Sequence, residues 1–64
     1  MQLHVPDMNC GGCARAVTAA IREVDAGATV EADPPSRMVK VQTSAPAAAI
    51  QKVLAEAGFP ASVK

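Results

Sequence analysis

Residues 8–24, Met-Asn-Cys-Gly-Gly-Cys-Ala-Arg-Ala-Val-Thr-Ala-Ala-Ile-Arg-Glu-Val, place a pair of cysteines directly before a helical pattern. The apolar side chains that recur at the spacing of one helix face are Val17, Ala20, Ile21 and Val24. The side chains that point in other directions and should be exposed are Arg15, Thr18, Arg22 and Glu23. The stretch therefore predicts a cysteine-bearing loop, followed by an amphipathic helix from Cys13 to Val24.

A second helical pattern extends from about Ala45 to Ala57. Its apolar face consists of Ile50, Val53, Leu54 and Ala57. Ser44 is expected to be its N-cap, and Pro46 suits its first turn. Gly58 stands where helices commonly end in a left-handed residue, so this helix has the better-marked ends.

Four short segments alternate apolar and polar residues with the period of a strand: 2–5, 29–32, 38–42 and 61–63. The intervening run 33–37, Asp-Pro-Pro-Ser-Arg, has the composition of a turn and should join the second and third strands as a hairpin. The element order is then βαββαβ. We predict a ferredoxin-like α+β fold, with a four-stranded antiparallel sheet and two helices on one face, as a single domain over residues 1–64.

Charge and composition exclude several classes of function. Six basic and six acidic residues give a formal net charge of zero, and Phe59 is the sole aromatic residue, so the chain lacks the features of a nucleic-acid binder. No apolar run approaches the roughly 18 residues of a membrane span, and residues 1–7 do not resemble a signal peptide. A chain this short is not expected to form an enzyme pocket. We expect a cytoplasmic protein with reduced thiols and without membrane insertion.

Cys10 and Cys13 are the candidate metal ligands. Two thiolates three positions apart can converge on one ion, and Gly11 and Gly12 should ease the sharp turn between them. Cys13 is expected to open the helix, where the positive end of the helix dipole favours thiolate over thiol. Soft sulfur ligands select copper(I) among the cytosolic ions, so the pattern favours a copper(I) site.

Other uses of a Cys-x-x-Cys pair stay open at this point. A closed zinc site needs four ligands, and beyond the cysteines the chain offers only His4 and scattered carboxylates. An open zinc site that recruits Asp7, or one shared between two molecules, would need fewer ligands from each chain. Dithiol oxidoreductases usually carry an aromatic residue before the pair and a proline inside it, and neither is present here. A structural disulfide would close too small a loop to stabilise much.

The run from Met8 to Ala14, with the apolar positions of the first helix and residues 30–33, 39–41 and 50–59, resembles the heavy-metal-associated domain family. That family includes bacterial copper chaperones, the mercury-binding periplasmic protein and amino-terminal domains of metal-transporting P-type ATPases. The resemblance covers nearly the whole chain and is strongest to the bacterial copper chaperones. It implies the βαββαβ fold, copper(I) held by Cys10 and Cys13 in near-linear geometry, and delivery of the ion to a P-type ATPase domain of similar fold.

The resemblance also assigns roles to single residues. It implies that Met8 points into the core and anchors the loop, and that Phe59 lies beside the site and shields the thiolates without offering a charge or hydrogen bond. Asp7 departs from the family's usual glycine, and Asn9 from its threonine or serine. Zinc-selective relatives tend to carry aspartate where Asn9 stands, which weakens the zinc interpretation. His4 is expected to be an ordinary strand residue.

Three alternatives to a copper chaperone remain: a domain that binds zinc, cadmium or mercury, an excised amino-terminal domain of an ATPase, and a dithiol oxidoreductase. The start of the chain at Met1, two residues ahead of the first strand, and its end directly after the fourth strand favour the free protein. We expect a monomer, with a metal-bridged dimer as the alternative state. Arg15, Arg22 and Lys52 are interpreted as part of a solvated face.

Overall fold

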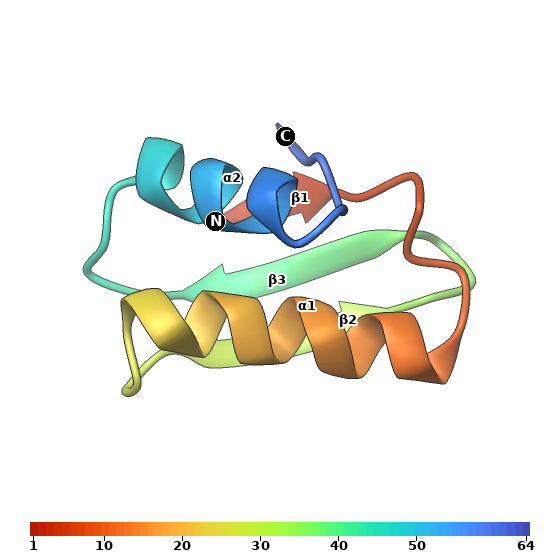
Figure 1. Cartoon of the computed structure of the whole chain (residues 1–64), viewed down its shortest axis with the longest axis horizontal. Coiled ribbons are helices and arrows are strands. Elements are labelled where there is room, and N and C mark those ends of the chain that lie inside the picture. The colour runs from red at the N-terminus through yellow and green to blue at the C-terminus, as the bar shows by residue number, and fades with distance from the viewer.

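The computed structural model describes residues 1–64 and has the predicted element order. The elements are β1 (Gln2–His4), α1 (Gly11–Val24), β2 (Thr29–Asp33), β3 (Met38–Gln42), α2 (Ala47–Glu56) and β4 (Ser62–Val63). The sheet order is β2-β3-β1-β4, and every neighbouring pair is antiparallel. Both helices lie over the same face of this sheet (Figure 1). The ferredoxin-like α+β fold predicted from the sequence is confirmed.

The hydrophobic core fills the space between the sheet and the helices. Its buried residues are Leu3, Val5, Met8, Val17, Ala20, Ile21, Ala28, Val39, Val41, Ile50 and Leu54. These side chains are small or medium in size, which suits the close packing of one helix layer on one sheet layer. Val24 and Val63 differ from expectation, being 39% and 47% exposed. Val24 is the last residue of α1 and Val63 belongs to a two-residue edge strand, so neither is covered from both sides.

The turn at residues 33–37 forms as predicted. The Ser36 backbone N–H donates to the Asp33 carbonyl at 3.2 Å, and Arg37 adopts a left-handed φ of 60°. The end of α2 also matches the prediction. Gly58 has a φ of 90°, its N–H donates to the Ala55 carbonyl at 3.1 Å, and the Phe59 N–H donates to the Leu54 carbonyl at 2.8 Å. This is the Schellman arrangement, and it fixes where Phe59 leaves the helix.

The start of α2 differs from the prediction. Pro46, not Ser44, is the N-cap, and no side chain caps the helix. One turn earlier, the Thr43 hydroxyl donates to Asp25 Oδ2 at 2.7 Å and accepts from the Ala45 N–H at 3.1 Å. The hydrogen bond from Thr43, assisted by backbone N–H groups of Gly27 and Ser44, lowers the pKa of Asp25 against a smaller opposing effect of burial. This contact joins the end of α1 to the loop before α2.

Neither helix combines the length and the apolar character that crossing a lipid bilayer requires.

Candidate metal centre

The loop between β1 and α1 is fastened to the core by Met8. After Pro6 and Asp7 the chain turns back, and the Met8 N–H donates to the Val5 carbonyl at 3.0 Å. The Met8 side chain is fully buried, at 0% exposure, so its thioether packs in the core. The expectation that Met8 points inward is confirmed. The next residues, Asn9 and Cys10, are exposed and lead into the helix at one end of the molecule (Figure 1).

Helix α1 begins earlier than the sequence pattern indicated. Its first residue is Gly11 and its N-cap is Cys10, whose backbone is extended (φ −150°, ψ 167°). Cys10 Sγ accepts the Cys13 backbone N–H at 3.3 Å, and the Cys10 carbonyl accepts the Ala14 N–H at 3.0 Å. The prediction that Cys13 opens the helix is therefore wrong. Cys10 occupies the place where a side chain satisfies a free N–H group of the first turn.

The two cysteine sulfurs lie 2.9 Å apart and are not joined by a disulfide. Cys10 is exposed and Cys13 is half-buried. The pKa of the Cys10 thiol is lowered from 9.0, first by its side-chain hydrogen bond with Cys13 and then by hydrogen bonds with the backbone N–H groups of Cys13 and Gly12, against an opposing effect of desolvation. A negative charge on Cys10 is also favoured by the positive end of the helix dipole.

The glycines contribute differently from what the sequence pattern predicted. Neither Gly11 nor Gly12 has a positive φ, since both belong to the first turn of α1. A Cβ built at Gly11 would meet no atom within 4 Å, while one at Gly12 would lie 3.9 Å from Cys10 Sγ. Gly12 therefore leaves open space beside the Cys10 sulfur, and neither glycine is needed to bend the chain.

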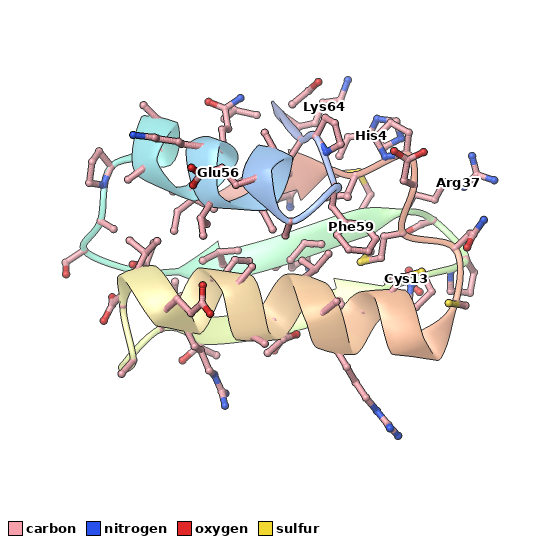
Figure 2. All side chains as sticks on the ribbon, viewed as in Figure 1. His4, Cys13, Arg37, Glu56, Phe59 and Lys64 are labelled. Carbon is pink, nitrogen blue, oxygen red and sulfur yellow. The ribbon has the colours of Figure 1, made fainter.

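Three further residues lie at different positions relative to the cysteine pair. Asn9 Oδ1 lies 3.9 Å from Cys13 Sγ and accepts from that thiol, a contact that was not predicted from the sequence pattern. Phe59 is half-buried and lies toward the same end of the molecule as Cys13 (Figure 2). His4 projects away from Cys13 in the same view. No three of the chain's His, Cys, Asp and Glu side chains come together as a possible metal site, so a closed zinc site within one chain is not assembled.

The fold and the loop together define a small ferredoxin-like domain that presents two reduced thiols at the start of a helix. The family model described as heavy-metal-associated domain matches residues 2–60, and the chain belongs to this family. Membership confirms the resemblance drawn from residues 8–14 and from the later strands and second helix.

Solved structures agree with this assignment. A gold binding protein shares 51% sequence identity, with a TM-score of 0.93 and coverage of 95% of this chain and 94% of that one. A trimeric form of a variant of the copper chaperone Atx1 from Synechocystis PCC6803 shares 35% identity, with a TM-score of 0.93 and coverage of 97% and 98%. Oxidized MerP from Ralstonia metallidurans CH34 shares 33%, with a TM-score of 0.88 and coverage of 98% and 92%. No curated protein sequence matches the chain significantly.

Proposed function

We propose that this chain is a metallochaperone that carries copper(I) between the thiolates of Cys10 and Cys13. The observation that carries the proposal is the sulfur pair itself: two reduced cysteines 2.9 Å apart on a surface loop, one of them with a lowered pKa. Thiolate is the form that binds metal, and two thiolate ligands suit a soft monovalent ion. The copper chaperone among the similar structures supports copper(I) as the ion.

Loading the ion requires the two sulfurs to move apart. Metal–thiolate bonds are about 2.3 Å long for zinc, so sulfurs on opposite sides of an ion with similar bonds lie about 4.6 Å apart. Cys10 is exposed and the space beside its sulfur at Gly12 is open, so rotation of the Cys10 side chain can supply this opening. Met8 stays buried below the loop, which keeps the backbone of the site in place while the side chain moves.

A two-ligand site is also suited to release. In the proposed transfer, a thiolate of the acceptor forms a third copper–sulfur bond, and the bond to Cys10 then breaks. The second bond, to Cys13, is exchanged in the same way, and the freed thiolates regain protons from water. Copper stays copper(I) throughout, so no electron donor is needed. We propose a P-type ATPase domain of similar fold as the acceptor and the cytoplasm as the compartment, because reduced thiols persist there.

The choice of ion has a direct competitor. The name of one similar structure, a gold binding protein, points to another soft metal in a domain of this fold, and zinc, cadmium or mercury would use the same thiolates. Asn9, directly before Cys10, is neutral and adds no hard anionic ligand for zinc. The reduced protein should therefore take copper(I) in preference to zinc when both are offered. Thiolate-to-metal absorption bands measure this, and retention of zinc in the presence of equimolar copper(I) would overturn the proposed ion.

A dithiol oxidoreductase is the second candidate, because close sulfurs and a lowered thiol pKa also favour disulfide formation. Insulin reduction with dithiothreitol as the electron source separates the two functions. A carrier should give a rate no higher than that of the Cys10→Ser variant. Turnover that requires both cysteines would favour the oxidoreductase. The same experiment applies whether the domain works as a free protein or as part of an ATPase.

A further inference from the structure

The chain's single histidine and one of its three methionines are partners on the face of the sheet that carries no helix. His4 of β1 stands opposite Met38 of β3 in the strand register. Their chain neighbours Leu3 and Val39 are fully buried toward the helices. Because side chains alternate along a strand, His4 and Met38 project from the opposite face. Both are half-buried.

The hydrogen bonds of the sheet bring these two side chains close. The Val5 N–H donates to the Arg37 carbonyl at 2.8 Å, which makes the next pair along, His4 and Met38, a non-hydrogen-bonded pair. In such pairs the Cα atoms are about 4.5 Å apart and the side chains approach more closely than in hydrogen-bonded pairs. An imidazole nitrogen and a thioether sulfur at this separation can bind one ion between them.

We propose that His4 and Met38 form a second, weaker site for a soft monovalent cation, copper(I) or silver(I). Thioether sulfur is a soft ligand that favours copper(I), and imidazole also binds copper. Both ligands are neutral, so this site binds more weakly than a pair of thiolates. Asp33 of β2 is the register partner of Met38 on its other side. The hollow beside Met38 is lined by Asp33 and Glu31 and also by Lys40, so this face carries charges of both signs. His4 projects away from Cys13, so the site is separate from the cysteine pair (Figure 2).

The test uses the Cys10→Ser/Cys13→Ser protein, so that its outcome does not depend on the thiolate site. Silver(I) is titrated into this protein while nuclear magnetic resonance follows the His4 ring and the methionine methyl groups. One equivalent should bind, with shifts of the His4 ring and the Met38 methyl. Removal of a residue that only hydrogen-bonds to a metal ligand weakens metal affinity about 10–100-fold. Removal of a ligand itself should cost no less, so His4→Gln and Met38→Leu should each weaken silver(I) binding at least about tenfold.

Met1→Leu is the matched control, because Met1 is 40% exposed and is not paired with His4. It should leave silver(I) binding unchanged. Circular dichroism checks that each variant is folded, and His4→Asn and Met38→Ile serve as a second pair of substitutions. Binding that survives substitution of both His4 and Met38, or shifts confined to Met1, would overturn the second site. If the second site is not found, the proposal that the cysteines bind copper(I) still stands, because copper(I) binding by the cysteines is measured on the unsubstituted protein.

Discussion

Replacement of Met8 separates its structural role from a role as a ligand. Met8 is fully buried, so Met8→Ala removes a core side chain and leaves a cavity. Truncations of this kind cost about 2–5 kcal/mol. At about 0.05–0.15 kcal/mol per residue, a domain of 64 residues has a total stability of only about 3–10 kcal/mol, so the variant should be close to unfolding. In a domain of this size each kcal/mol shifts Tm by about 4–8 °C, which predicts a fall of more than about 8 °C.

Met8→Leu keeps the volume and apolar character of the side chain but removes its sulfur. Swaps of this kind usually cost less than about 1.5 kcal/mol. Because the thioether is buried in the core, this variant should bind copper(I) as tightly as the unsubstituted protein. The assays are urea unfolding of the metal-free proteins and a copper(I) competition titration of each folded variant. A loss of copper affinity in Met8→Leu comparable to that in Cys10→Ser would show that the Met8 sulfur is a ligand and would refute this reasoning.

Three further substitutions, two of them with a matched control, test the contacts around the site and at the helix ends. Cys13→Ala removes the main cause of the lowered Cys10 pKa, so the Cys10 pKa should rise toward 9.0. Thiolate absorbance titrated against pH measures this pKa. An unchanged or lower pKa would show that Cys13 is not the cause. Thr43→Val removes the bond from the Ala45 N–H and should cost about 1 kcal/mol in urea unfolding, while Thr43→Ser should cost less. Because folding lowers the pKa of Asp25 from 3.8, the ionised Asp25 carboxylate stabilises the fold above pH 3.8. This stabilisation is lost as the pH falls through the lowered pKa of the folded state. Thr43→Val should make this acid-side loss smaller, and equal acid sensitivity in both proteins would argue against the contact. Gly58→Ala should lower the free energy of unfolding by about 1–2 kcal/mol, because Gly58 has a φ of 90°. Gly11→Ala should leave it unchanged or raise it, because Gly11 has no positive φ and a Cβ there meets no atom. Equal losses of stability in the two variants would contradict this backbone geometry.

Periodic patterns in the sequence were sufficient to predict the fold. Val17, Ala20 and Ile21 are buried at the spacing of one helix face, and Val39 and Val41 are buried at the spacing of a strand. Gly58 could be placed at a helix end because few other residues adopt its left-handed conformation. These predictions succeed because they depend on local geometry and on burial of a whole face.

Helix starts and fine contacts could not be predicted from the same patterns. Helix α1 begins two residues before Cys13, because Cys10 caps it with a thiol, a side chain that is not among the usual N-caps. Ser44 does not cap α2, and the polar contact nearby is made by Thr43 with Asp25, 18 residues away in the chain. The 2.9 Å between the sulfurs and the contact of Asn9 with Cys13 depend on side-chain rotamers that spacing alone does not fix.

A copper(I) titration against a chelator of known affinity tests the central proposal most directly. The fully reduced protein, Cys10→Ser and Cys13→Ser are compared under anaerobic conditions at one pH. Serine keeps an oxygen that can cap the helix at position 10, so the fold is preserved while a thiolate ligand is lost. The unsubstituted protein should remove one copper(I) per chain from the chelator, and neither variant should remove any. Retention of competitive binding by either single variant would contradict a site made by Cys10 and Cys13 together.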